Sequence, residues 1–186
     1  MPPVRALLLA VPLLLALALL LPAAPAEARP GACASAHVEV DRATIAKARD
    51  ATLCLLNRVR ARHDLPQLRL NPRLSRAARR HTRDMVRRRY FAHDSLDGRS
   101  FSQRIHAARY VPRGASWWIG ENLGWGSGSL AEPMSLVRAW MRSPGHRANI
   151  LNRTFRDIGI GIAPRAPVGG YRDGATYTTD FGRLAR

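Results

Sequence analysis

The chain has 186 residues, of which 30 are lysine or arginine and 13 are aspartate or glutamate, so its formal net charge is +17. This length suits one domain with a single sizeable core. The charge predicts attraction to polyanions such as anionic wall polymers or phospholipid headgroups. The sequence contains no pattern typical of a nucleic-acid-binding module, which excludes dedicated recognition of DNA or RNA.

Residues 1–28 have the layout of a secretory signal peptide. Arg5 precedes an apolar run over residues 6–21, and small residues after this run offer a cleavage site. A membrane anchor is the alternative, because the run approaches the roughly 20 residues that span a bilayer. Pro12 and the small residues favour cleavage. We therefore expect a secreted, extracellular monomer that meets a membrane only through an uncleaved signal.

Cys33 and Cys54 are the two cysteines of the chain. In an exported protein such a pair most simply forms one disulfide. The bond would join residues 29–51, an N-terminal arm with the start of the first helix, to the rest of that helix. Closing a loop of about 20 residues stabilises a fold by about 3 kcal/mol in the chain-entropy model. A catalytic or metal-binding thiol pair is the alternative, although the spacing resembles no metal knuckle.

The first half of the mature chain shows helical spacing of apolar residues. One pattern begins at Thr44 and ends near His63. A second helix begins after Asn71, because an N-cap asparagine followed by Pro72 is typical of a helix start. Its apolar stripe includes His81, which we interpret as a core histidine with satisfied hydrogen bonds. The opposite face is either a solvated surface or a polyanion-binding surface, and it carries Arg73, Arg76, Arg80, Arg83 and Arg87.

The middle of the chain alternates shorter segments. A turn at residues 97–98 precedes a short helix over 101–108, and residues 117–123 read as a strand that leads into a flexible glycine-rich loop at 124–128. Two further helices begin with proline in the first turn, at Pro133 and Pro144.

The C-terminal third changes to the period of strands. Bulky isoleucines at residues 158, 160 and 162 alternate with Gly159 and Gly161, so this strand has one bulky face and one bare face. The bare face lets another element approach the backbone closely. A second alternating segment over residues 175–181 follows a short loop, which predicts an antiparallel pair. The order of elements predicts an α+β fold with antiparallel strands between helical layers.

Five short motifs follow one another in an order that resembles a known family. They are Leu55–Arg60, Phe91–Ser95, Gly120–Leu123, Trp140–Arg147 and Gly159–Gly161. Over about residues 52–183 the chain is similar to the superfamily of cysteine-rich secretory proteins, antigen 5 and pathogenesis-related proteins (CAP, or SCP-like, domains), in its bacterial exported branch. The resemblance implies a three-layer α-β-α sandwich with a small antiparallel sheet and a cleft lined by two histidines and two glutamates.

Three residues of this chain match that polar tetrad: His93, Glu121 and His146. The second glutamate of the family lies three residues after the helix tryptophan, where this chain has Ser143. The three matching residues are the candidate catalytic groups, because two imidazoles and a carboxylate can serve as acid, base and orienter. They can also bind a divalent metal, with His93 and His146 as zinc ligands and Glu121 or water completing the shell. The resemblance implies that such zinc binding is weak.

Other residues near these motifs have supporting roles in our interpretation. Ser95 is expected to donate a hydrogen bond into the cleft, and Asn122 to tie loops together. Ser143 is either a hydroxyl nucleophile beside His146 or, more simply, an N-cap. Three tryptophans at residues 117, 118 and 125 belong either to the core or to the wall of a groove for sugar rings or acyl chains.

Two functions are compatible with these patterns. The first is a non-enzymatic exported protein that binds an anionic envelope polymer, a lipid or another protein through the polar cleft and the basic surface. The second is a hydrolase of the cell envelope, acting on peptidoglycan or protein through His93, Glu121 and His146. The high positive charge and the replaced glutamate favour binding.

Overall fold

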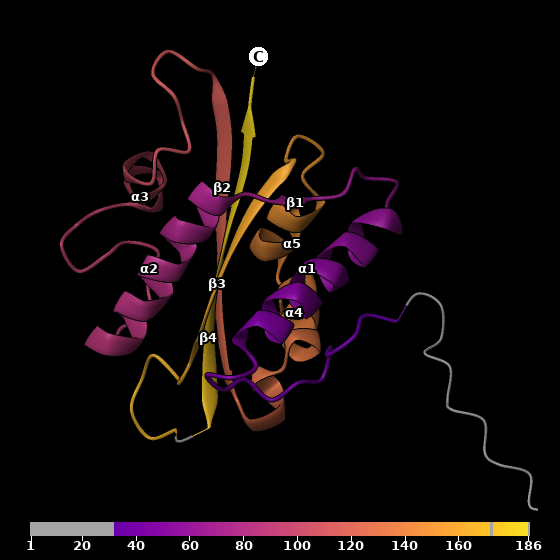
Figure 1. Ribbon diagram of the computed structural model, residues 1–186, viewed down its shortest axis with the longest axis vertical. Coiled ribbons are helices and arrows are strands. Elements are labelled where there is room, and N and C mark those ends of the chain that lie inside the picture. Colours follow the sequence, from indigo (N-terminus) through magenta and orange to yellow (C-terminus); the bar gives the residue numbers. More distant parts are fainter. Residues whose placement is uncertain (1–31, 172, 186) are drawn as a thin grey trace, which may run out of the picture. The chain divides into compact units, whose positions relative to one another are not determined.

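The computed structural model describes residues 32–171 and 173–185, and the expected signal peptide therefore lies outside the described residues. The elements in chain order (Figure 1) are α1 (Ile45–Ala61), β1 (Arg69–Leu70), α2 (Pro72–Arg88), α3 (Phe101–Ala107), β2 (Trp117–Ser127), the 3₁₀ helix η1 (Gly128–Ala131), α4 (Pro133–Arg142), α5 (Pro144–Leu151), β3 (Asp157–Pro164) and β4 (Gly174–Leu184). None of the helices within these ranges is both long and apolar enough to cross a bilayer.

The sheet has the strand order β1-β3-β4-β2. The long strand β4 is central and pairs antiparallel with both β2 and β3, which confirms the predicted antiparallel sheet. Strand β1 adds a parallel pair with β3 at the edge. The sequence did not predict this strand, because two residues are too few to show an alternating pattern.

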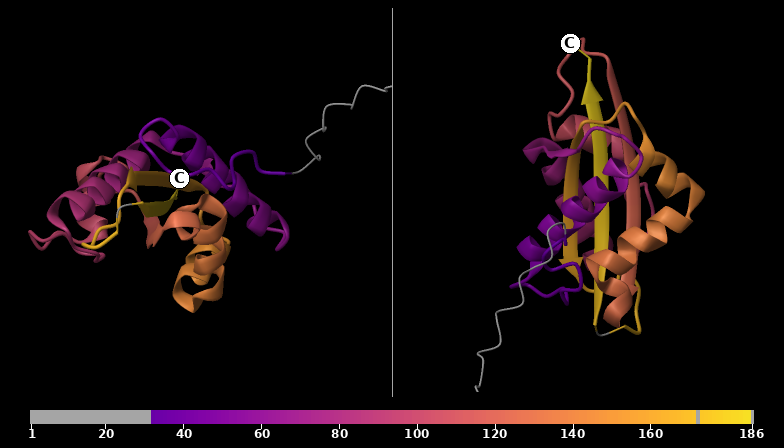
Figure 2. Two further views of the ribbon diagram at one scale, coloured as in Figure 1. Left: turned by 90° about the horizontal axis from the view of Figure 1, so that it is seen from below. Right: turned by 90° about the vertical axis from the view of Figure 1, so that its right-hand side faces the viewer.

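The two faces of β3 explain how the helices are layered. Its isoleucines belong to a core that also contains Leu56 of α1 and Trp140 of α4. On the other face a Cβ atom at Gly159 or Gly161 would overlap the backbone of α2. The bare face thus receives α2, whereas α1, α4 and α5 cover the opposite face (Figure 2). This arrangement confirms the α+β fold and its three α-β-α layers.

The predicted helix starts are confirmed. Asn71 caps α2, since its side-chain oxygen accepts hydrogen bonds from the backbone N–H groups of Arg73 and Leu74 at 2.9 and 3.3 Å. Pro133 and Pro144 open α4 and α5. Helix α1 ends at Ala61, two residues before the expected boundary.

The flexible loop expected at residues 124–128 is wrong for most of its length. Strand β2 continues to Ser127 and stays paired with β4 throughout. The glycines permit close packing: a Cβ at Gly124 would lie 2.7 Å from Leu136 Cδ1 of α4. Glycine within a strand can mark such a close approach as readily as it marks a loop.

The disulfide between Cys33 and Cys54 is formed. It joins the N-terminal arm to α1, as the sequence predicted, and leaves no free cysteine among the described residues.

Candidate functional site

Glu121, on the edge strand β2, is the centre of a polar cluster that also contains His93 and Arg104. Its side chain is 1% exposed, and each carboxylate oxygen has one charged or chargeable partner. His93 Nδ1 lies 2.9 Å from Oε1, and Arg104 Nη2 lies 2.6 Å from Oε2. A buried carboxylate is costly unless it is paired and hydrogen-bonded, and here both conditions are met.

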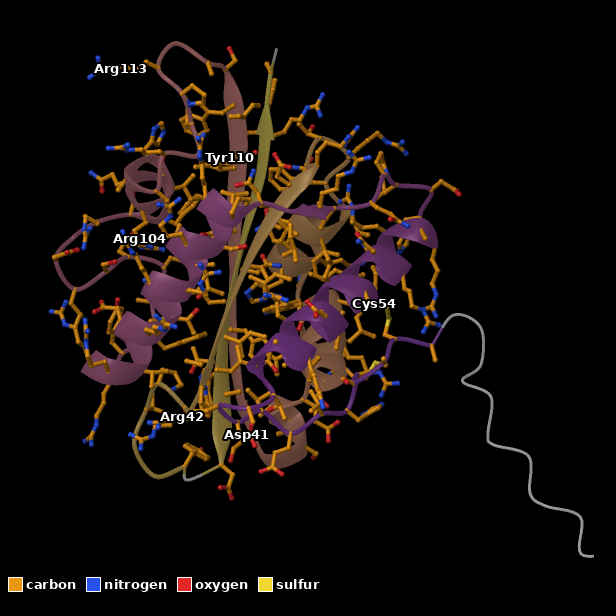
Figure 3. All side chains as sticks on the ribbon, viewed as in Figure 1. Asp41, Arg42, Cys54, Arg104, Tyr110 and Arg113 are labelled. Atoms are coloured by element: carbon orange, nitrogen blue, oxygen red, sulfur yellow. A yellow bond between two sulfur atoms is a disulfide. The ribbon has the colours of Figure 1, made fainter. Side chains whose placement is uncertain are left out.

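Arg104, from α3, holds the loop that carries His93. The guanidinium is buried where α3 approaches α2 (Figure 3). Besides pairing with Glu121, its Nη1 donates to the backbone oxygens of His93 and Arg99 and to Ser95 Oγ, at 2.7, 3.1 and 3.3 Å. Sequence reasoning missed Arg104. Arg104 lies between Phe101 and Ala108 on the apolar stripe of α3. This position indicates that the arginine is buried and requires a carboxylate partner.

Asp180 is the second residue that sequence reasoning missed. It lies on β4 directly opposite Glu121 of β2 and is 1% exposed. Burial, followed by the charge of Glu121, raises the pKa of Asp180 well above its ordinary value. The raised pKa favours the protonated, neutral form of Asp180, and Arg104 pairs with Glu121. Asp180 Oδ1 has no hydrogen-bond partner among the described residues.

His93 covers Glu121 from the solvent side. The hydrogen bond to Glu121 raises the pKa of His93 above its ordinary value, against burial and the charge of Arg104, which lower it. Because the carboxylate accepts, the Nδ1 atom of His93 carries the proton in this pair. Its side chain is 55% exposed. The contact thus fixes the ring tautomer, and Nε2 takes no part in the hydrogen bond to Glu121.

His146 lies in the first turn of α5, and its backbone oxygen accepts a hydrogen bond from Asn122 Nδ2 at 3.1 Å. Burial, followed by the charge of His93, lowers the pKa of His146 below its ordinary value. The structure therefore brings His93 and Glu121 into direct contact, and it ties the backbone of His146 to the neighbouring residue Asn122.

The supporting residues have mixed outcomes. Asn122 does tie elements together, because it also accepts a hydrogen bond from Asn149 of α5 at 2.8 Å. Ser95 is buried and accepts from Arg104. Ser143 occupies the N-cap position of α5, but its side chain makes no capping hydrogen bond. The predicted N-cap position of Ser143 is therefore confirmed, although its side chain does not contribute the usual capping hydrogen bond.

His81 is buried as predicted, but its hydrogen bonds are not all satisfied. Its Nε2 lies 2.9 Å from the backbone oxygen of Ala92. Its Nδ1 is buried without a partner among the described residues. Burial, followed by the charge of Arg104, lowers the pKa of His81.

The predicted metal set fits poorly. Among the described residues no group of three or more His, Cys, Asp or Glu side chains is placed to hold a metal ion. Both oxygens of Glu121 are engaged by His93 and Arg104. Two imidazoles remain, fewer than the three protein ligands of most catalytic zinc sites. Zinc binding through His93 and His146 stays a prediction, and no reaction step is derived from it.

His93, Glu121 and His146 do not line either of two hollows among the described residues. One, of about 370 Å³, lies between α2 and α3 and shares His81, Ser95 and Arg104 with the polar cluster. The other, of about 600 Å³, lies between the N-terminal arm and the ends of β3 and β4, and contains no residue of the cluster.

Trp117 and Trp118 are surface residues rather than core, and Trp125 is half-buried. Trp117 and Trp118 are 38% and 48% exposed. Trp117 packs edge-on against the ring of His106, and Trp125 packs against Tyr171. None of the three lines the groove between α2 and α3.

The sequence profile of the Cysteine-rich secretory protein (CAP) family matches residues 53–178, more than half of the chain. The chain belongs to the CAP family. Similar Bacillus subtilis proteins are YkwD, which is 36% identical over 107 residues, and the membrane protein YlbC, which is 28% identical over 110 residues. These matches cover 58% and 59% of this chain but 39% and 30% of the relatives, so the chain matches less than half the length of either.

Solved structures agree with this assignment to the CAP fold. An extracellular SCP-domain protein from Bacillus anthracis has a TM-score of 0.56 and 26% identity, covering 76% of this chain and 44% of that chain. An outer surface protein from Borrelia burgdorferi has a TM-score of 0.64 and 21% identity, covering 80% of this chain and 99% of that chain. The second likeness bears on the fold alone.

The polar cluster of this chain lacks the second glutamate of the tetrad that the family resemblance implies. The position of the second glutamate is Ser143, so α4 and α5 bring no carboxylate to the cluster. A second buried carboxyl group, that of Asp180 on β4, lies opposite Glu121, and its burial raises its pKa. The charge of Glu121 is balanced by Arg104 inside the protein.

Proposed function

We propose that this chain is an exported binding protein that takes an anionic ligand of the cell envelope on its basic α2 surface, with the Glu121 cluster as the structural support of the neighbouring loops. The ligand is an envelope polymer, a lipid or a protein with negative charge. The observation that carries this proposal is the excess of arginines on α2, seven against one acidic residue.

The Glu121 carboxylate, which both His93 and Arg104 engage, is poorly suited to hydrolysis. Glu121 is 1% exposed, and its partner Arg104 is buried with it. To act as a general base, a group must reach the proton that it removes within about 3 Å. Glu121 reaches His93 and Arg104 instead. Hydrolysis by the residues of the family tetrad would thus depend on the two histidines alone.

The α2 surface supports an anionic ligand. Helix α2 contains a single acidic residue, Asp84, and seven arginines: Arg73, Arg76, Arg79, Arg80, Arg83, Arg87 and Arg88. Burial, followed by the charges of Arg83, Arg49 and Arg76, lowers the pKa of Arg79. Such mutual repulsion is the mark of a surface with unbalanced positive charge, which attracts polyanions.

An extracellular location also has support. The similar Bacillus anthracis protein is extracellular. The Cys33–Cys54 disulfide is typical of a protein that folds in an oxidising compartment. An exported protein of net charge +17 meets the anionic polymers and headgroups of the envelope directly.

The test is co-sedimentation with purified peptidoglycan sacculi that retain their anionic polymers, at a series of salt concentrations. We expect the protein to pellet at low salt and to be released as salt rises, because screening shortens electrostatic attraction to about 10 Å at 0.1 M salt. An α2 triple variant should lose pelleting, and a matched triple variant of exposed arginines on α4 and α5 should keep it. The two sets are Arg76→Gln, Arg80→Gln and Arg83→Gln, and Arg138→Gln, Arg142→Gln and Arg147→Gln. Equal loss in both would reject α2 as the binding surface.

Envelope hydrolysis is the second candidate, and one contact favours it. The carboxylate of Glu121 fixes the tautomer of His93, which is how a base is oriented in many hydrolases. Mass spectrometry of soluble products from the same sacculi tests this function. Fragments that appear with the wild type, and vanish in the His93→Ala/His146→Ala variant or with chelator, would establish a hydrolase and reject a purely binding role.

A further inference from the structure

The groove between α2 and α3 has an unusual combination of side chains. Its volume is about 370 Å³, and its lining includes the small residues Ala77, Ala107 and Ala108. Its walls contain one carboxylate, from Asp84, and five guanidinium groups. These belong to Arg80, Arg83, Arg87, Arg99 and Arg104.

Two of the five arginines are free to hold a ligand. Arg104 is used inside the protein, Arg87 pairs with Asp84 at 3.1 Å, and Arg99 pairs with Asp97 at 2.7 Å. Arg80 and Arg83 form no ion pair or side-chain hydrogen bond with any residue that the structure describes, and both are exposed. Guanidinium groups form strong paired hydrogen bonds with phosphate and carboxylate oxygens. The groove therefore offers a place for an anion.

His81 adds an acceptor to this set of donors. The backbone oxygen of Ala92 can only accept, so Nε2 of His81 carries the proton in their 2.9 Å hydrogen bond. In the neutral ring, Nδ1 is then a bare lone pair. His81 lines the groove and is 1% exposed, and its Nδ1 has no partner among the described residues. A buried polar atom without a partner is costly, which favours a ligand group that donates to it.

A simple anion does not satisfy both requirements. A fully ionised phosphate, sulfate or carboxylate suits Arg80 and Arg83 but has no proton for His81 Nδ1. A ligand that carries a hydroxyl next to its anionic group satisfies the arginines and the histidine together. Polyol phosphates have this composition, because each phosphate ester is followed by a hydroxylated carbon chain.

We propose that the α2–α3 groove binds the glycerol phosphate unit, with its phosphate on Arg80 and Arg83 and a hydroxyl donating to His81 Nδ1. The inference rests on the proposed envelope-binding function and names the ligand class for it. The arginine row extends beyond the groove, since Arg76, Arg80, Arg83 and Arg87 follow helical spacing on α2. A chain of repeating phosphates can therefore continue along the helix from the groove.

The first experiment compares three probes by NMR titration of the purified protein at pH 8: sn-glycerol 3-phosphate, methyl phosphate and sulfate. We expect glycerol 3-phosphate to bind about fivefold more tightly than methyl phosphate, the ratio that one added hydrogen bond supplies. Its shift changes should centre on His81, Ser95 and Arg104. Equal affinities for the three probes, or shifts spread evenly along α2, would overturn the proposal.

Variants separate the two contacts. Arg80→Gln/Arg83→Gln should weaken both phosphate probes about tenfold or more, because charge-assisted hydrogen bonds are the strong ones. The matched pair Arg138→Gln/Arg142→Gln on α4 should change neither. His81→Phe should abolish the preference for glycerol 3-phosphate and leave methyl phosphate binding unchanged. If His81→Phe does not fold, the probe preference of the wild type decides.

Competition identifies the source of the unit. Displacement of glycerol 3-phosphate by soluble poly(glycerol phosphate) would assign a polymer, and displacement by phosphatidylglycerol vesicles would assign a lipid headgroup. Displacement by neither would overturn an envelope ligand for the groove. Co-sedimentation keeps the two proposals apart. Salt-sensitive pelleting through α2 without glycerol phosphate binding would refute the groove site alone, and loss of both would refute the binding function as well.

Discussion

At the scale of single residues, the titratable groups around Glu121 influence one another's pKa values. Burial, followed by the charge of Glu121, raises the pKa of Asp180, and the hydrogen bond to Glu121 raises the pKa of His93. Arg104 pairs with Glu121 on the other carboxylate oxygen. His146 is pushed toward its neutral form by burial and by the charge of His93. The pKa values of the two histidines are thus displaced in opposite directions by one shared neighbourhood.

This opposition gives a direct prediction for NMR titration of the imidazole protons. The pKa of His93 should lie above the ordinary value of about 6.5 and that of His146 below it. The His93→Gln variant should raise the pKa of His146, because the repelling charge is gone. His63→Gln, at the exposed end of α1, serves as the control and should not change it. An unchanged pKa of His146 in the His93→Gln variant would show that the two rings do not interact.

The same shift has a consequence for stability that depends on pH. Folding raises the pKa of His93, so protonation of its ring favours the folded state. This contribution is fully present below the unfolded pKa of about 6.5 and is lost as the pH rises through the folded value. The deficit in unfolding free energy of His93→Gln should therefore be larger at pH 5.5 than at pH 8.5 in denaturant titrations. A deficit that grows with pH would contradict the His93–Glu121 contact.

The buried pair of Arg104 and Glu121 can be tested by a double-mutant cycle. Arg104→Met leaves Glu121 buried without its cation, which should cost about 3–5 kcal/mol of unfolding free energy. The double variant Arg104→Met/Glu121→Gln removes both charges and should recover a large part of that loss. The single variant Glu121→Gln completes the cycle, and urea denaturation measures the unfolding free energy of the three variants against the wild type. Additive effects would mean that the two charges do not depend on each other.

At the scale of secondary structure, the glycines of β3 decide how closely α2 approaches the sheet. A Cβ at Gly161 would overlap the backbone of Ala78, which cannot move away as a flexible side chain can. The glycine face of β3 therefore lets α2 pack closely on the sheet, and α2 carries the arginines on its outer face.

Gly161→Ala should therefore destabilise the fold by about 1–3 kcal/mol, the usual cost of overpacking, or by more if α2 shifts. The matched control is Gly145→Ala in α5, where a Cβ would meet nothing within 4 Å. Alanine is the better helix former, so this control should be neutral or stabilising. Thermal unfolding of both variants gives the comparison, and an unchanged midpoint for Gly161→Ala would show that α2 is free to move.

Elements with a repeating pattern could be predicted from the sequence, and contacts between distant elements could not. The alternation of isoleucine and glycine in β3 predicted both of its faces, and Asn71–Pro72 predicted the start of α2. Strand β2 was cut short because Gly124 and Gly126 were taken for loop residues, whereas they make room for α4 and η1. Whether a glycine marks a loop or a close approach depends on a partner that lies elsewhere in the chain.

For the candidate site, too, the sequence motifs predicted individual residues but not the contacts between distant elements. The motif resemblance supplied His93, Glu121 and His146, and the structure brings the first two into contact. The pairing of Glu121 with Arg104 and its position opposite Asp180 depend on how α3 and β4 meet β2, which no local periodicity contains. The free Nδ1 of His81 is also a property of the folded chain, because its apolar-stripe position indicated burial but not the missing partner.

At the scale of the whole molecule, the net charge of +17 works against the compact state. The charges are concentrated on α2, where burial, followed by Arg83, Arg49 and Arg76, lowers the pKa of Arg79. Self-repulsion of this kind destabilises a folded protein and is relieved when salt screens it. Anionic ligands that bind to this surface should relieve the repulsion too.

Raising the salt concentration from about 0.01 M to about 0.1 M shortens the screening length from about 30 Å to about 10 Å. The melting temperature should rise by about 2–4 °C, the shift that about 1 kcal/mol produces in a domain of this size. The triple variant Arg76→Gln, Arg79→Gln and Arg83→Gln should respond much less to salt, because it removes clustered charges. Arg138→Gln, Arg142→Gln and Arg147→Gln lower the net charge equally but leave α2 intact, so this control should keep most of the response. Equal responses of the two variants would mean that total charge, and not its concentration on α2, sets the repulsion.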